Sequence, residues 1–187
     1  MAETPSTMVA LGIKAPDFKL PDTVSGKIMS LTELASKTAT VIMFICNHCP
    51  FVKHVQLELV NLANEYMPQG ISFVAISSND VESYPADSPE NMKEVANRFN
   101  FPFVYLYDES QQVARAYQAA CTPDFFIFDR NLKLVYRGQL DDSRPGNDIP
   151  VSGRDIRNSL DRIINNEAVS ERQMPSIGCN IKWKKTD

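Results

Sequence analysis

The stretch "TATVIMFICNHCPFVKHVQLEL", residues 38–59, joins an apolar run to a helical pattern through two cysteines. Residues 38–45 form a short, nearly continuous apolar run, which is typical of a strand buried on both faces. Apolar residues then recur at helical spacing: Val55, Leu59, Leu62, Ala63 and Tyr66. Cys46 and Cys49 therefore lie where a buried strand is expected to lead into an amphipathic helix.

The rest of the chain predicts an α/β domain with a mixed sheet. Proline and glycine punctuate residues 14–34, which favours an N-terminal hairpin. Ser88-Pro89 is typical of a helix start, and Ser152 with Asp155 forms a capping-box pattern before a last helix. Further strands are expected at 71–78, 101–108, 124–129 and 131–141. Alternating strands and helices indicate a central sheet with helices on both faces, and the closing hairpin makes it mixed.

The composition excludes some partners and compartments. Of the 187 residues, 43% are hydrophobic and 22% charged, as in ordinary soluble globular proteins. The net charge of -4 offers no broad basic field, so neither nucleic acid nor membrane is expected as a partner. Residues 1–18 lack the basic and apolar regions of a secretory signal. A cytoplasmic location is therefore the expectation.

Two cysteines at a helix start are suited to thiol–disulfide chemistry. Amides at a helix N-terminus are unpaired and the helix dipole favours negative charge there, which stabilises a thiolate. We expect Cys46 to be the more exposed nucleophile, with a lowered pKa, and Cys49 to resolve a mixed disulfide. A partly protonated His48 would stabilise the Cys46 thiolate further. This chemistry needs no cofactor.

The same residues leave a metal site and a pair of buried thiols open as alternatives. Cys46, Cys49, His48 and His54 are soft ligands close together in the sequence. A structural zinc site normally needs four convergent ligands, and a helix start does not supply them. We therefore expect no metal here, and a copper-binding or redox-silent interaction module is kept as a non-enzymatic alternative.

Three motifs together resemble those of the peroxiredoxin-like thioredoxin family: "CNHCPFVKHV" (46–55), "CTPDFF" (121–126) and "GCNIKW" (178–183). The entry "APDFKLPDTVSGKIMSLTEL" (15–34) resembles the N-terminal hairpin of peroxiredoxins. The resemblance covers about residues 10–184. It implies a thioredoxin fold with an N-terminal β-hairpin and a C-terminal extension.

That resemblance divides the chain into three parts. Residues 1–12 are expected to form a flexible N-terminal arm, residues 13–166 a thioredoxin-like redoxin domain, and residues 167–187 a C-terminal extension that packs on the domain. It implies a thiol–disulfide oxidoreductase acting on protein or small-molecule disulfides and thiols. No particular oligomeric state is predicted.

The resemblance also implies site residues. Cys46 and Cys49 are the dithiol, and Pro123 is the expected cis-proline. In this superfamily the cis-proline exposes the backbone before it, here that of Thr122, to pair with an extended substrate. Asp124, beside the proline, is a candidate proton acceptor when Cys49 attacks, or else an ordinary turn or strand residue.

Two further cysteines have open roles. Cys121 precedes the predicted cis-proline and is either a third redox thiol or a small buried apolar residue. Cys179 is either a resolving cysteine on an exposed, mobile tail or a packing residue, with Trp183 pinning the tail to the domain.

A thiol peroxidase is the second enzymatic alternative. Peroxiredoxins use a P-x-x-x-T-x-x-C motif. If Cys49 takes the peroxidatic position, Cys46 replaces the threonine and Ile42 the proline. Peroxidase activity is therefore expected to be weak.

Overall fold

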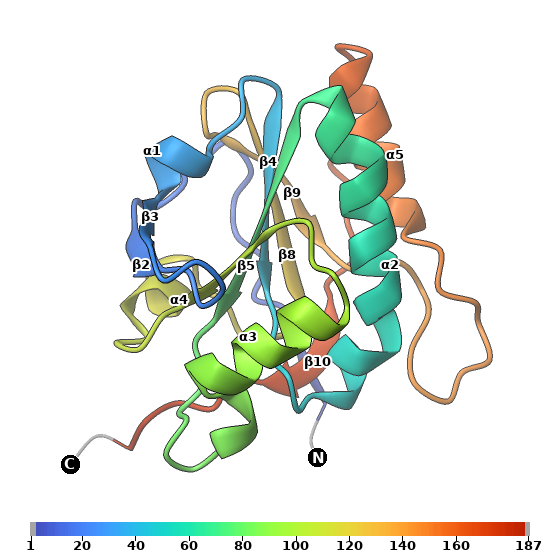
Figure 1. Ribbon diagram of the computed structural model, residues 1–187. Helices are drawn as coiled ribbons and strands as arrows, with labels where there is room; N and C mark the ends of the chain where they lie inside the picture. Colours follow the sequence, from blue (N-terminus) through green and yellow to red (C-terminus); the bar gives the residue numbers. More distant parts are fainter. Residues whose placement is uncertain (1–2, 186–187) are drawn as a thin grey trace.

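A central five-stranded sheet runs through the protein (Figure 1). The structure, a computed structural model, describes residues 3–185. The strand order is β6–β5–β4–β8–β9; β4, β5 and β6 are parallel, whereas β8 is antiparallel to both β4 and β9. The strands are β4 (Ala39–Phe44), β5 (Ile71–Ser77), β6 (Val104–Tyr107), β8 (Asp124–Asp129) and β9 (Leu134–Gly138). The predicted mixed sheet is confirmed.

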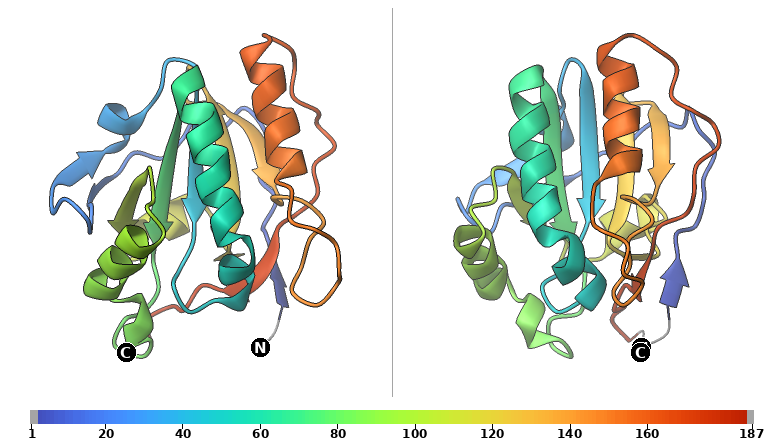
Figure 2. Two further views of the ribbon diagram at one scale, coloured as in Figure 1. Left: turned by 45° about the vertical axis from the view of Figure 1, so that its right-hand side comes forward. Right: turned by 90° about the vertical axis from the view of Figure 1, so that its right-hand side faces the viewer.

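The central strand β4 sends alternate side chains into two cores. Val41 and Met43 pack in one cluster with α2, α3 and α5, while Ile42 and Phe44 pack in the other with α1 and α4. In the right-hand view of Figure 2, α2 and α5 both lie in front of the sheet. The helices are α1 (Leu31–Leu34), α2 (Pro50–Tyr66), α3 (Pro89–Arg98), α4 (Gln112–Ala116) and α5 (Arg154–Ile164), with 3-10 helices η1 (Met67–Gln69) and η2 (Pro85–Asp87). Helices thus cover both faces, as predicted.

The start of α5 differs from the prediction. Ser152 and Asp155 do not form a capping box; Gly153, with φ 63°, is the N-cap residue and gives no side-chain cap. The Asp141 carboxylate instead accepts the backbone N–H groups of Ser152 and Gly153, at 2.6 and 2.7 Å. The Asp141 carboxylate therefore holds the backbone directly before the helix.

Two smaller sheets flank the central one. They are the predicted hairpin, β2 (Lys19–Pro21) with β3 (Ile28–Ser30), and a three-stranded sheet in the order β1–β10–β7, from Glu3–Pro5, Ile177–Asn180 and Cys121–Thr122. No helix among residues 3–185 is long and apolar enough to cross a membrane.

The expectation of a flexible arm over residues 1–12 is wrong for residues 3–6, where the described part of the chain begins. β1 pairs antiparallel with β10, and Ser6 is 6% exposed, with its hydroxyl donating to Asp124 at 2.9 Å. Residues 1–2 lie outside the described part of the chain. The N-terminal segment is ordered because a strand from the opposite end of the chain offers it a pairing edge.

Candidate active site

The two cysteines follow the buried strand β4 directly. β4 ends at Phe44, and α2 begins at Pro50 with Cys49 as its N-cap residue. Proline suits the first helical position because its missing N–H would have no carbonyl partner there. The helix terminus therefore lies at Cys49, three residues beyond Cys46.

Both thiols are buried, with exposed fractions of 2% for Cys46 and 0% for Cys49. Cys46 has the larger exposed fraction of the two, as expected, but it is not open to solvent. Thr122 faces both sulfurs: its Oγ1 lies 3.4 Å from the Cys46 Sγ, and its carbonyl accepts the Cys49 thiol at 3.1 Å. All four cysteines carry thiols, with no disulfide among them.

The pKa values of the two thiols shift in opposite directions. A hydrogen bond from the Cys46 thiol lowers the pKa of Cys49 to about 4, and the Cys179 thiol and the Val52 amide act in the same direction against burial. The same bond raises the pKa of Cys46 well above its ordinary value, as do burial and the charge of Asp87. The pKa of Cys46 is therefore shifted opposite to the expected lowering, because its thiol donates to Cys49 and is itself buried.

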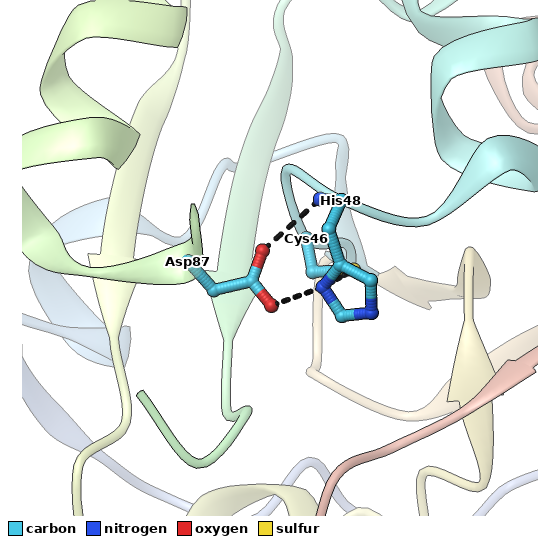
Figure 3. A group of neighbouring side chains, drawn as sticks. All are labelled: Cys46, His48 and Asp87. Atoms are coloured by element: carbon cyan, nitrogen blue, oxygen red, sulfur yellow. Dashed lines mark hydrogen bonds and ion pairs between the residues drawn. The ribbon is translucent and has the colours of Figure 1, made fainter. Parts of the chain in front are cut away.

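Asp87, the last residue of η2, anchors the cysteine turn (Figure 3). Its Oδ1 accepts the backbone N–H groups of Asn47 and His48 at 2.8 and 3.1 Å. Its Oδ2 contacts His48 Nδ1 at 2.6 Å and accepts the Asn79 side-chain amide at 2.8 Å. Burial alone would raise the Asp87 pKa, but the hydrogen bonds from His48 and Asn79 bring it below its ordinary value. The carboxylate thus holds the turn and the imidazole, whose Nδ1 lies 3.9 Å from the Cys46 Sγ.

The residues that surround His48 were not predicted from the sequence. Asp87 is hydrogen-bonded to His48, and Asn79 is hydrogen-bonded to Asp87. The Tyr84 ring stacks on the imidazole, with the ring centroids 5.1 Å apart and a 16° interplanar angle. All three come from the loop after β5, which shows neither helical nor strand periodicity. No spacing rule connects this loop to the cysteines; parallel pairing of β4 with β5 brings the two together.

The arrangement fits a hydrogen-bonded group better than a metal site. Cys46, His48 and Asp87 are the one trio of ligand-type residues in the described chain whose ligand atoms all lie within 4.8 Å of one another. Two ligands about 2.1 Å from a tetrahedral ion lie about 3.4 Å apart, whereas the His48 Nδ1 and Asp87 Oδ2 are 2.6 Å apart. His54, the second histidine among the possible ligands, has its Nε2 2.7 Å from the Ser143 hydroxyl instead.

The Thr122–Pro123 peptide bond is cis, as predicted. The backbone of Thr122, which precedes this bond, was expected to be open to a substrate and is not. Thr122 is the antiparallel partner of Cys179, so β10 of the same chain occupies the edge at which an extended substrate was expected to dock. An incoming peptide meets an edge that is already paired.

Asp124 is engaged away from the dithiol. It is fully buried and pairs with the equally buried Arg137 at 3.0 Å, while the Ser6 hydroxyl and the Ala120 N–H also donate to it. Burial raises its pKa although Arg137 opposes the rise. These contacts describe a structural ion pair and give no support to a proton-accepting role toward Cys49.

The two remaining cysteines are both buried. The Cys121 thiol donates to the Pro123 carbonyl at 3.5 Å, and burial together with the charge of Asp124 raises its pKa. Cys179 is 1% exposed in β10, which excludes the exposed, mobile tail. Burial and its hydrogen bond to Cys49 raise the Cys179 pKa to about 12.

Comparisons with known proteins identify the family of the chain. The family model described as Redoxin matches residues 10–154. The thiol-disulfide oxidoreductase ResA of Geobacillus thermodenitrificans (strain NG80-2) is 28% identical over 131 residues, which cover 70% of each chain. The Redoxin match includes β4, the cysteine turn and α2.

Solved structures show the same architecture. The crystal structure of an uncharacterized conserved protein from Geobacillus kaustophilus is 62% identical, with a TM-score of 0.98 and coverage of 100% of this chain and 99% of that one. The thioredoxin domain of a thiol-disulfide oxidoreductase from Bacteroides vulgatus is 17% identical, with a TM-score of 0.59 over 70% of this chain and 89% of its own. At that identity the likeness concerns the fold alone, and the fold is that of thioredoxin.

Proposed function

The chain belongs to the redoxin family, and we propose that it is a thiol–disulfide oxidoreductase that cycles Cys46 and Cys49 between a dithiol and a disulfide. One observation carries this proposal: Thr122 contacts both sulfurs, at 3.4 Å from the Cys46 Sγ and 3.1 Å from the Cys49 Sγ, at the start of the helix that follows a fully buried strand. The substrates would be small-molecule or protein disulfides and thiols.

The proton shared by the Cys46 and Cys49 sulfurs defines which cysteine attacks the substrate and which resolves the mixed disulfide. Cys46 passes its proton to the Cys49 thiolate and attacks one sulfur of a substrate disulfide; a mixed disulfide forms, the substrate S–S bond breaks, and the other sulfur leaves as a thiolate. Cys49 then gives its proton to that thiolate and attacks the Cys46 Sγ. The Cys46–Cys49 bond forms, the second substrate sulfur leaves, and the substrate has gained two electrons.

His48 and Asp87 act as positioning residues in this scheme. Asp87 fixes the turn amides, and its charge keeps the proton on Cys46 until a substrate arrives. His48 fills the space beside the Cys46 sulfur and is itself held by Asp87. Neither exchanges electrons, so their replacement should slow the reaction without changing which disulfide forms.

Stopped-flow oxidation of the reduced protein by oxidised glutathione tests the proposal. The wild type should release two glutathione thiols per chain and form the Cys46–Cys49 disulfide. Cys49→Ser should stop at a Cys46–glutathione disulfide with one thiol released, and Cys46→Ser should lose the fast phase. Cys121→Ser, which changes an equally buried thiol, is the matched control and should behave as the wild type. A Cys46→Ser protein that reacts at the wild-type rate would overturn the assignment.

The lowered pKa of Cys49 favours a second candidate, a thiol peroxidase. Here the Cys49 thiolate attacks a hydroperoxide; the S–O bond forms, the O–O bond breaks, and an alcohol or water leaves. The Cys46 thiol then condenses with the sulfenic acid, forming the disulfide and releasing water. The same variants treated with hydrogen peroxide separate the candidates, because rapid peroxide consumption that survives Cys46→Ser requires Cys49 to react first.

A further inference from the structure

A strand from the C-terminal segment fits closely along the edge beside the dithiol. β10 pairs with β7 so that Cys179 lies opposite Thr122, and β1 covers the other edge of β10. A Cβ atom on Gly178 would lie 2.0 Å from the Thr122 carbonyl oxygen, so the two backbones approach in a way that only glycine permits. Figure 1 shows β10 beside the start of α2, with which it is in contact.

The strand register turns the Cys179 side chain toward the dithiol. Directly opposite residues in neighbouring strands project to the same face of a sheet. The Thr122 hydroxyl is 3.4 Å from the Cys46 Sγ, so this face is the one that meets the dithiol. Cys121 precedes Thr122 in β7 and therefore projects to the opposite face.

Cys49 consequently lies between two thiols. Cys46 is hydrogen-bonded to it from the turn, and Cys179 is hydrogen-bonded to it from β10. The Cys49 Sγ also contacts the carbonyl of Thr122, the residue that Cys179 faces across the strands. All three cysteines belong to one cluster of buried residues.

We propose that Cys179 is a third redox-active cysteine, which exchanges with the Cys46–Cys49 disulfide to give a Cys49–Cys179 disulfide. This inference rests on the proposed function, which supplies the first disulfide. The Cys179 sulfur attacks the Cys49 Sγ; the Cys49–Cys179 bond forms, the Cys46–Cys49 bond breaks, and the proton lost by Cys179 is taken up by Cys46. No electrons enter or leave, so the step needs no further oxidant.

The exchange regulates access to the same site. It returns Cys46 to the thiol form and ties β10 covalently to the start of α2. An extended partner that pairs with Thr122 must displace β10, and a Cys49–Cys179 bond prevents that displacement. Oxidation of the protein thus locks β10 over the docking edge, and reduction allows a partner to displace β10 again.

Disulfide mapping tests the inference on the full chain. Reduced wild type, Cys46→Ser, Cys179→Ser and the control Cys121→Ser are incubated with oxidised glutathione to completion, quenched in acid, unfolded, alkylated and digested without reduction. The wild type and Cys121→Ser should contain both Cys46–Cys49 and Cys49–Cys179 peptides. Cys179→Ser should contain the first alone. Cys46→Ser should convert its Cys49–glutathione adduct to Cys49–Cys179 and release a second glutathione.

Two results separate failure of this inference from failure of the proposed function. If Cys46–Cys49 forms but Cys179 is fully alkylated in both the wild type and Cys46→Ser, Cys179 has no redox role and the proposed function stands. If neither the wild type nor Cys179→Ser forms Cys46–Cys49, the proposed function fails, and with it the exchange that depends on it. The wild-type map keeps the test decisive even if Cys46→Ser does not fold.

Discussion

Replacing Asp87 by alanine should loosen the turn that carries both cysteines. The carboxylate is fully buried and accepts four hydrogen bonds, from two turn amides, the His48 ring and the Asn79 amide. His48, with a side chain 20% exposed, can regain water, whereas Asn79 is 2% exposed and cannot. The Asn79 amide and the Asn47 N–H would be left without an acceptor, which costs about 1–3 kcal/mol for each buried donor. We therefore expect the unfolding free energy to fall by about 3 kcal/mol. For a chain of this size that lowers Tm by roughly 6–12 °C.

Urea unfolding of the reduced protein measures this loss, and stopped-flow exchange with oxidised glutathione measures its effect on the dithiol. Asp87→Ala should slow exchange by about tenfold or more, since a turn that is no longer held misplaces the Cys46 sulfur. Asp80→Ala is the control: Asp80 is buried in the same loop and accepts the Glu82 N–H at 3.1 Å. It should lose less stability and keep the wild-type exchange rate. An Asp87→Ala protein with the stability or the rate of Asp80→Ala would refute the anchoring role.

Three other predictions concern the strand, the thiolate and the buried ion pair. Gly178→Ala should push β10 off Thr122, so that Cys179 is alkylated faster in the native state, as located by peptide mapping. A loss of about 1.4 kcal/mol in strand pairing already makes this alkylation tenfold faster. Between about pH 4, the folded pKa of Cys49, and about pH 8.5, the folded protein binds fewer protons at this thiol than the unfolded chain does. Its contribution to stability therefore rises with pH in that window and is lost as pH falls toward 4; urea titrations should show a component of the pH slope that Cys49→Ser lacks. Asp124→Ala leaves the Arg137 guanidinium buried without its carboxylate and should cost about 3–5 kcal/mol in urea unfolding with little change in exchange rate.

Local patterns predicted the parts of this fold that local physics determines. The apolar run of residues 38–45 became β4, because a strand with both faces buried needs no polar side. The helical pattern after the cysteines became α2, which ends at Tyr66, the last residue of that pattern. The cis bond before Pro123 followed from family resemblance rather than from physics, and the structure agrees with it.

The surroundings of the dithiol depend on contacts that no short pattern records. Asp87 reaches the turn only because β4 and β5 are neighbours in the sheet. β10 covers Thr122 by pairing with a strand more than 50 residues earlier in the chain, and residues 3–5 join it from the other end. The start of α2 at Pro50, with Cys49 as its N-cap residue, was not fixed by the pattern either, because helix boundaries are what periodicity defines least well.

Equilibration of the protein in glutathione redox buffers, with each disulfide identified by mass, tests the central claim most directly. We expect Cys46–Cys49 to form and disappear reversibly in a single two-electron transition, in which a tenfold change in the ratio of dithiol to disulfide corresponds to about 29.6 mV. Cys121→Ser should give the same midpoint. A protein that keeps both thiols across the whole buffer range, or that forms glutathione adducts on Cys46 or Cys49 and never the bond between them, would contradict the account.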